Sequence, residues 1–264
     1  MIELEVSGKR ERIRPGLHIC QLYNQRDELT HTTAALLRDG LRGSDKCYFA
    51  GSAQRVADLH KLLRAGHLDV EGALASGQLQ LCEERDELLR EGRFDPYHLL
   101  STHLALVARA LNEGWQQVRA VIDMGWLAQE VATPEQLLKY EAASDAVFTF
   151  QGRPIVALLQ YNYAELPGEV VVELLKLHPI AVVGRFIKRN PYYVNAEDYM
   201  VKIIRRGQPG AAGHVGQPGH AGLVGAGAGG AGGQAAGLGA VAERGGSLGR
   251  PQAPVASAAR DAAS

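Results

Sequence analysis

Apolar residues in this chain gather in short runs that alternate with longer stretches of helical spacing. Each short run has the length of a strand and is rich in aliphatic and aromatic residues. The longer stretches repeat an apolar residue every three or four positions, as a helix with one buried face does. This alternation predicts an α/β fold with a mostly parallel central sheet of about six strands and helices on both faces. The predicted strands are residues 17–23, 46–50, 78–82, 118–122, 155–161 and 180–183.

The predicted central strand, residues 118–122, ends at Asp123. In an open parallel sheet, ligands bind in the crevice outside the carboxyl ends of the strands. A carboxylate there costs desolvation energy unless it is paired, so Asp123 is the first candidate functional residue. Capping of the following turn is an equally open structural role for it. The least polar run, residues 155–161, predicts a strand that is covered on both faces.

Two predicted helices carry clear start signals. Asp95-Pro96 and Thr133-Pro134 each place a capping side chain before a proline at the first helical position. Glu141 lies in the middle of the second helix, where one face is expected to be buried, and a buried carboxylate needs a partner. Arg119 and Lys139 are predicted to be solvated surface charges rather than that partner.

The two ends of the chain differ from its middle in composition. Residues 1–15 predict an irregular N-terminal segment that closes at Pro15-Gly16. Residues 207–264 are rich in Gly and Ala, and a collagen-like period of three within them is too short to form a stable triple helix. Because this segment buries too little apolar area to offset chain entropy, we predict that it is disordered. One domain, residues 16–206, remains between the two ends.

Charge and cysteine usage narrow the function classes. The net charge of −1 over 264 residues gives no global basic field for nucleic acid, so we expect no direct nucleic-acid binding. The sequence begins with acidic residues where a secretory signal needs basic ones, and no apolar run approaches the roughly 20 residues that span a bilayer. The three cysteines form no CxxC pair. These features predict a cytoplasmic protein without a membrane partner.

A nucleotide-binding protein of this class has a glycine-rich, phosphate-binding loop after its first strand. Here Asn-Gln-Arg-Asp-Glu-Leu follows Tyr23, and no GxxxxGK[ST] or GxGxxG motif occurs before residue 207. Catalytic ATP hydrolysis is therefore not expected. Several potential metal ligands could converge at one sheet edge, but no pair has ligand spacing, so we predict no metal site and no cofactor. These residues are His18, Cys20, Cys47, Cys82, Asp123 and His178.

Several short segments, taken together and in order, resemble one family, the MEDS domain. This is a sensory domain named after methanogens, methylotrophs and a dichloromethane-responsive repressor. The resemblance covers roughly residues 16–195. It rests on residues 16–23 (Gly-Leu-His-Ile-Cys-Gln-Leu-Tyr), 92–96 (Gly-Arg-Phe-Asp-Pro), 123–126 (Asp-Met-Gly-Trp), 140–141 (Tyr-Glu), 160–162 (Gln-Tyr-Asn), 178–179 (His-Pro) and 190–194 (Asn-Pro-Tyr-Tyr-Val).

The resemblance implies a RecA-like or KaiC-like α/β domain that has lost its phosphate loop and senses small hydrocarbon derivatives. Members of the family are joined to, or signal to, regulatory proteins such as sigma-factor regulators, kinases and transcription factors. We therefore expect a non-catalytic sensory domain that binds a small organic ligand near the carboxyl ends of the strands. The expected ligand-binding residues are His18, Cys20, Tyr23, Asp123, Trp126, Glu141, Tyr161 and His178.

Three alternatives stay open. The first is a RecA-like protein that binds or slowly hydrolyses nucleotide through a non-standard phosphate loop, with Asp123 positioning magnesium. The second is a metal or thiol redox switch that uses Cys20, Cys47 and Cys82. The third is a pure interaction protein whose site no longer binds a ligand.

Overall fold

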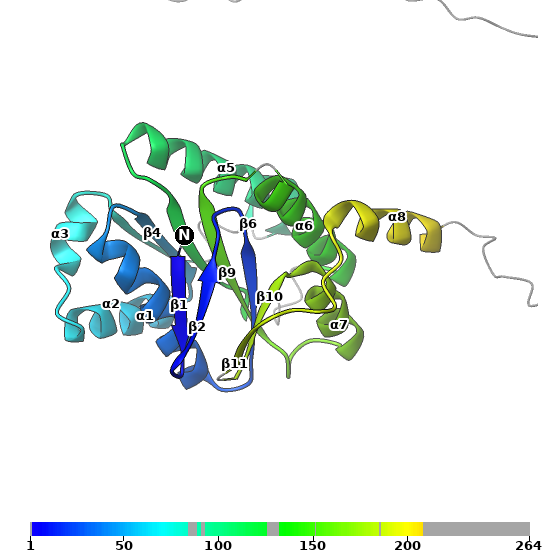
Figure 1. Cartoon of the computed structure of the whole chain (residues 1–264), viewed down its shortest axis with the longest axis horizontal. Helices are drawn as coiled ribbons and strands as arrows, with labels where there is room; N and C mark the ends of the chain where they lie inside the picture. The colour runs from blue at the N-terminus through cyan, green and yellow to red at the C-terminus, as the bar shows by residue number, and fades with distance from the viewer. Residues whose placement is uncertain are drawn as a thin grey trace, which may run out of the picture. The chain divides into compact units, whose positions relative to one another are not determined.

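The computed structural model describes residues 2–83, 89–90, 93–125, 132–150, 152–184 and 186–207. Its centre is a seven-stranded sheet with the order β11-β10-β3-β9-β8-β4-β5 (Figure 1). All neighbours in it are parallel except β10 and β11. The six predicted strands and the α/β class are confirmed. The strands are β3 (His18–Tyr23), β4 (Lys46–Gly51), β5 (Leu79–Glu83), β8 (Val118–Asp123), β9 (Ile155–Asn162), β10 (Ile180–Val183) and β11 (Phe186–Arg189).

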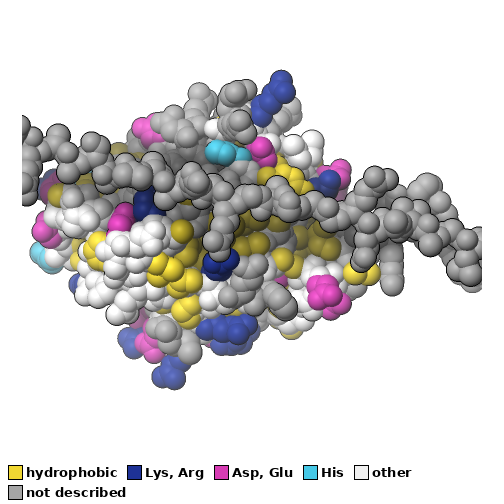
Figure 2. Space-filling view, turned by 90° about the horizontal axis from the view of Figure 1, so that it is seen from above, with side chains coloured by type: hydrophobic (Ala, Val, Ile, Leu, Met, Phe, Trp, Pro, Cys, Tyr) yellow, Lys and Arg dark blue, Asp and Glu magenta, His cyan; other side chains and the backbone are white. Residues whose placement is uncertain are grey.

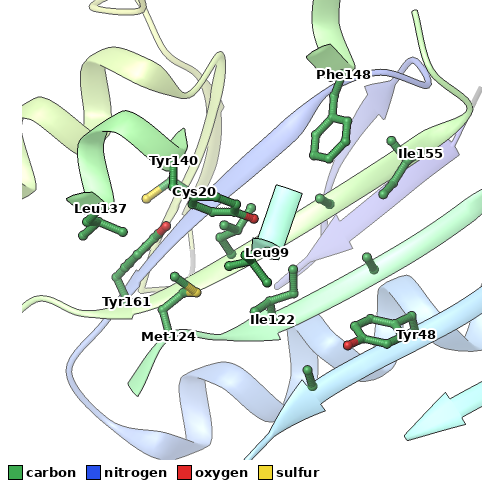
Figure 3. Close-up of a cluster of buried hydrophobic side chains, with 14 of the residues drawn as sticks. Cys20, Tyr48, Leu99, Ile122, Met124, Leu137, Tyr140, Phe148, Ile155 and Tyr161 are labelled. Atoms are coloured by element: carbon green, nitrogen blue, oxygen red, sulfur yellow. The ribbon is translucent and has the colours of Figure 1, made fainter. Parts of the chain in front are cut away.

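Helices cover both faces of this sheet, and each face has its own apolar core. One core joins α5 (Pro96–Asn112), α6 (Pro134–Asp145) and α7 (Gly168–Leu177) to the sheet (Figure 3). The other joins α1 (Arg26–Arg42), α2 (Ala53–Ala65) and α3 (Val70–Ala75) to the opposite face. We call them the α5–α7 face and the α1–α3 face. None of the described helices is long and apolar enough to cross a membrane.

Alternation along β3 and β9 decides which side chains each core receives. Cys20 and Leu22 enter the core of the α5–α7 face, whereas Ile19 enters the other core. Every residue of β3 is buried, as is β9 up to Tyr161, because both strands lie inside the sheet and are covered twice. The predicted double coverage of the 155–161 run is confirmed.

The two predicted helix starts are also confirmed. The Asp95 side chain accepts hydrogen bonds from the backbone N–H groups of Tyr97 and His98, and proline follows at the first position of α5. Thr133 and Gln136 form a reciprocal capping box at the start of α6. A π-helical turn, η2 (Ala146–Phe150), continues α6 at its end.

The prediction that residues 1–15 form an irregular segment is wrong. Residues 2–13 form an antiparallel hairpin of β1 (Ile2–Val6) and β2 (Lys9–Ile13). Ser7 and Gly8, both with positive φ, form its two-residue turn. Ile2, Leu4 and Val6 point into the core of the α1–α3 face, while the glutamates between them are exposed. That strict alternation was the strand signal in the sequence.

Other elements also differ from the sequence-based expectation. A short strand pair that was not predicted, β6 (Leu89–Arg90) and β7 (Arg93–Phe94), precedes α5. The final helix, α8 (Ala196–Gly207), was not predicted, and neither was the edge strand β11. Two parts of the chain lie outside the described residues: Trp126, and the Gly- and Ala-rich tail after Gly207.

Candidate functional site

The structure separates the predicted site residues into two groups on opposite faces of the sheet. His18, Cys20, Glu141, Tyr161 and His178 lie on the α5–α7 face. Tyr23 and Asp123 lie on the other face, where their side chains meet Arg55 of α2. The expectation of a single site at the carboxyl ends of the strands is therefore wrong. His18 opens β3 and His178 directly precedes Pro179 and β10, so both lie at the amino ends of strands.

The first group is centred on two histidines and a glutamate, which we call the His18–Glu141–His178 cluster. All three side chains are fully buried. The Glu141 Oε2 atom lies 3.2 Å from His178 Nε2 and 3.8 Å from His18 Nε2. The two imidazole rings are tilted against each other with centroids 4.2 Å apart. The partner that Glu141 was expected to need is therefore a histidine pair.

Neighbouring groups fix the orientation of this cluster. The Tyr161 hydroxyl donates to Glu141 Oε1, so that Oε2 faces the imidazoles. His178 ends α7, and its Nδ1 lies 2.7 Å from the carbonyl oxygen of Leu174. Because a carbonyl only accepts, Nδ1 carries a proton, and Nε2 is the ring nitrogen that faces Glu141. His178 thus also caps its helix, as the sequence suggested.

Burial controls the protonation of the groups around the cluster. It lowers the pKa of His18 well below the ordinary value, and the neighbouring His178 adds to that effect. Burial, together with the nearby Glu141, raises the pKa of the Cys20 thiol and that of the Tyr161 hydroxyl. At neutral pH His18 is therefore an uncharged ring and Cys20 a thiol. Figure 3 shows Cys20 and Tyr161 on this face, beside Tyr140.

His103 of α5 is a further buried histidine on this face and gives a pH-dependent prediction. Burial lowers its pKa to about 4, from an ordinary 6.5. Between pH 6.5 and pH 4 the unfolded chain binds a proton at His103 and the folded chain does not. The free energy of unfolding is therefore highest above pH 6.5 and falls as the pH is lowered toward 4. We expect His103 to cost about 2 kcal/mol of unfolding free energy between about pH 7 and about pH 5.

Denaturant unfolding of the wild type and His103→Gln at both pH values measures this contribution. The variant is expected to lose less stability on acidification, because glutamine does not titrate. His18 acts in the same direction but is present in both proteins, so it cancels. Equal losses in the two proteins would contradict the assignment.

Asp145, which the sequence did not single out, links the cluster to the surface. It lies one helical turn after Glu141 on α6, and its Oδ1 is 3.6 Å from His18 Nδ1. Its carboxylate accepts hydrogen bonds from the Thr149 and Tyr193 hydroxyls and from the backbone N–H of Ala196. Burial raises the pKa of this carboxyl group despite those donors. The spacing Glu141-x-x-x-Asp145 was the available signal, since it places both acids on one helix face.

Asp145 lies in the wall of a groove between α6, η2 and α8. The groove has a volume of about 680 Å³. Most of its wall area is apolar, and its polar and charged groups come from Lys139, Asp145, Thr149, Tyr193, Asn195 and Glu197. Those apolar walls include Pro96, Ala142, Ala143, Ala146 and Met200. Figure 2 shows apolar side chains exposed among charged ones on the face seen from above.

The second group surrounds Asp123 at the carboxyl end of β8. Its Oδ1 accepts hydrogen bonds from the Gly125 backbone N–H at 3.0 Å and from the Tyr23 hydroxyl at 3.5 Å. Its Oδ2 lies 3.6 Å from Arg55 Nε. Burial, and then the adjacent carboxylate, raises the pKa of Tyr23. Asp123 therefore has the turn-capping role considered for it, and it also has an arginine partner that the sequence did not reveal.

A chain of buried amides continues from Arg55 into the protein. Arg55 donates to Gln160 Oε1, and Gln160 Nε2 donates to Gln21 and to Thr33. Gln21 in turn donates to Thr32 and to the Glu28 carbonyl. Gln160 is followed directly by Tyr161, whose side chain points to the opposite face. Neighbouring residues of β9 therefore take part in both groups.

The segment after β3 does not offer free amides for a phosphate. The Glu28 carboxylate accepts hydrogen bonds from the backbone N–H groups of Asn24, at 3.1 Å, and Gln25, at 3.5 Å. A phosphate at this helix start would have to displace a carboxylate that already satisfies these amides. The nucleotide alternative thus receives no support from the geometry at the one place where this class of fold binds phosphate.

The geometry does not support a thiol switch in which Cys20 forms a disulfide with Cys47 or Cys82. None of the three cysteines, all of which lie in the described residues, forms a disulfide. Cys20 and Cys47 contribute to cores on opposite faces of the sheet. Cys82 lies on β5, four strands from β3, a separation of about 19 Å at ordinary strand spacing. Disulfide formation needs Cα atoms within about 7 Å, so Cys20 cannot reach Cys82.

The sequence of this chain is similar to that of a known domain family and of one of its members. The family model of the MEDS domain, described as the MEthanogen/methylotroph, DcmR Sensory domain, matches residues 17–179. The transcriptional repressor DcmR of Methylorubrum extorquens is 26% identical over 161 residues, which are 61% of this chain and 57% of that protein. The chain therefore spans little more than half the length of this relative.

Two solved structures of archaeal proteins are similar at 14% sequence identity. A KaiC-like protein from Pyrococcus horikoshii OT3 has a TM-score of 0.42, with 64% of this chain and 72% of that one covered. The flagellar accessory protein FlaH from Methanocaldococcus jannaschii has a TM-score of 0.44, with 65% and 72% covered.

Proposed function

Because the chain belongs to the MEDS family of sensory domains, we propose that it binds a small, weakly polar organic molecule and signals its presence to a regulatory protein. The resemblance that the short motifs indicated is confirmed at the level of the family. Its sensory and regulatory role also agrees with the relative named as a transcriptional repressor. The ligand and the receiving protein belong to the proposal.

The observation that carries the proposal is the groove between α6, η2 and α8. Its volume of about 680 Å³ lies in the range of small-molecule sites, and its walls are largely apolar with a few polar groups. Those polar groups include Asp145 and the Tyr193 hydroxyl that donates to it. A small alcohol, halocarbon or aromatic molecule fits such walls, because its apolar part is removed from water and one polar atom finds a partner.

Signalling follows from the elements that the ligand would touch. The groove joins α6 to α8, and the Asp145 side chain holds the start of α8 through the Ala196 backbone N–H, at 3.0 Å. A ligand that competes for Asp145 or Tyr193 therefore changes how α8 is attached. The receiving protein, a sigma-factor regulator, kinase or transcription factor, would distinguish α8 as it is attached without ligand from α8 as it is attached with ligand.

Thermal-shift screening of the purified chain with small halocarbons, alcohols and aromatic compounds tests the proposal. A ligand at about 100 times its Kd stabilises the folded state by about 2.7 kcal/mol, which raises Tm measurably. Ala146→Trp, which fills the groove, is expected to abolish the shift. Val172→Trp, at an exposed position of α7 outside the groove, is the matched control and is expected to leave the Tm shift unchanged.

The outcomes separate the ligand from its location. If no compound in the screen shifts Tm, the proposal that this domain binds weakly polar molecules fails. A shift that survives Ala146→Trp would keep the sensory function but exclude the groove as the site.

A further inference from the structure

We propose that His18, Glu141 and His178 form a binding site for one divalent transition-metal ion, with the chemistry best suited to Zn²⁺. This site lies beyond the groove of the proposed function, and it departs from the expectation of no metal drawn from residue spacing. The three side chains come from the start of β3, the middle of α6 and the end of α7, so no sequence spacing announces them.

The distances in the cluster match those of a metal site. One donor atom from each residue lies within 4.8 Å of the other two. Two ligands bound to zinc at about 2.0–2.1 Å in tetrahedral geometry are about 3.3 Å apart. The Glu141–His178 and Glu141–His18 pairs, at 3.2 and 3.8 Å, are close to this separation. An ion between the three donors needs only small side-chain rotations.

The donor atoms are also free and directed toward one another. Among the described residues, His18 Nδ1 and Nε2, Glu141 Oε2 and His178 Nε2 make no hydrogen bond although they are buried. His178 Nε2 faces a carboxylate oxygen, while Nδ1 of the same ring donates to the Leu174 carbonyl. A cation between His178 Nε2 and Glu141 Oε2, which lie 3.2 Å apart, would satisfy both buried atoms at once.

The surroundings supply the outer contacts that a metal site needs. Metal-bound histidines usually donate their second ring N–H to a carbonyl or carboxylate. His178 Nδ1 donates to the Leu174 carbonyl, and His18 Nδ1 lies 3.6 Å from the Asp145 carboxylate. Glu141 is oriented by the Tyr161 hydroxyl. Glu141 and His178 thus each have an outer hydrogen-bond partner, and the Asp145 carboxylate is the polar group nearest to His18 Nδ1.

The coordination leaves one tetrahedral corner for a water molecule or another small ligand, because the protein supplies three donors. Two imidazoles and one carboxylate form a ligand set that favours zinc over magnesium or calcium, which prefer oxygen ligands alone. Because the site is fully buried, the ion must be bound during folding or during a local opening. The test therefore includes refolding.

The experiment measures metal in the full chain after refolding with equimolar Zn²⁺ and desalting. We expect about one zinc per chain in the wild type by elemental analysis. Glu141→Gln and His178→Gln are expected to reduce this at least about tenfold, in line with the loss of a first ligand. His103→Gln removes a buried histidine outside the cluster and is the matched control, expected to retain zinc. Circular dichroism checks that each variant folds.

A second measurement keeps the test decisive if the cluster variants fail to fold. Wild-type protein refolded with Co²⁺ is expected to show the visible absorption of tetrahedral cobalt with nitrogen and oxygen ligands, and refolding with chelator is expected to lower Tm. A wild type that binds no zinc or cobalt on refolding overturns the proposal. So does stoichiometric metal that folded Glu141→Gln and His178→Gln retain, and so does a cobalt spectrum with thiolate charge-transfer bands.

Discussion

Asp45→Ala is expected to lower the free energy of unfolding by about 3–5 kcal/mol, because it leaves a buried guanidinium without its counter-ion. Arg119 Nε lies 2.6 Å from Asp45 Oδ2, and both side chains are less than a tenth exposed. Arg119 also donates to the Leu36 carbonyl, which fixes it under α1. The expectation that Arg119 is a solvated surface charge is therefore wrong. Urea unfolding of the wild type and the variant measures the loss.

The control for this prediction is an ion pair on the surface. Lys139 and Glu135 lie 2.8 Å apart on α6, with both side chains more than half exposed. Glu135→Ala is expected to cost far less than Asp45→Ala, since water and salt screen such exposed pairs. Similar losses in the two variants would show that the Arg119–Asp45 pair contributes no more than a surface pair.

Gly16→Ala is expected to destabilise the protein by about 2–5 kcal/mol through two separate effects. Gly16 has a φ of +90°, a conformation that costs an L-residue about 1–2 kcal/mol. A Cβ atom there would also lie 2.7 Å from the carbonyl oxygen of Phe148, a backbone atom that cannot rotate away. Such overpacking adds about 1–3 kcal/mol. Because His18 follows two residues later, this glycine sets where β3 enters the core.

Gly152→Ala separates the two effects of the Gly16 substitution. Gly152 also has a positive φ, of +59°, but a Cβ there would meet nothing within 4 Å. We expect this variant to lose only the conformational part, about 1–2 kcal/mol. Thermal unfolding of both variants gives the difference directly. A Gly152→Ala loss as large as that of Gly16→Ala would leave the close approach to Phe148 without effect.

The sheet could be predicted because its signals are local. A fully buried strand such as β9 needs a continuous apolar run, and the residues of that run are neighbours in the sequence. The edge strand β11 was not predicted, because only Ile187 in it is buried and no apolar pattern marks it in the sequence. The hairpin β1-β2 carried clear alternation in its first strand, but its second strand is mostly charged.

The arrangement of the candidate site could not be predicted from the sequence, and the role of its residues in ligand binding stays a prediction. Which face Tyr161 points to depends on register: Asp123 pairs with Gln160, so the next residue, Tyr161, points away from Asp123. No local pattern contains that register. The pairing of Glu141 with His18 and His178 depends likewise on how α6 and α7 pack on the sheet, and partners such as Arg55 and Asp145 appear only in three dimensions.

The placement of Gln160 and Tyr161 on one strand has a mechanical consequence. A single peptide bond joins them, so β9 cannot slide along its axis by even a fraction of an ångström without displacing both side chains. Such a movement strains the Gln160 contact to Arg55 and the Tyr161 contact to Glu141 at the same time. Displacement of β9 along its axis is therefore opposed by buried polar contacts on both faces of the sheet.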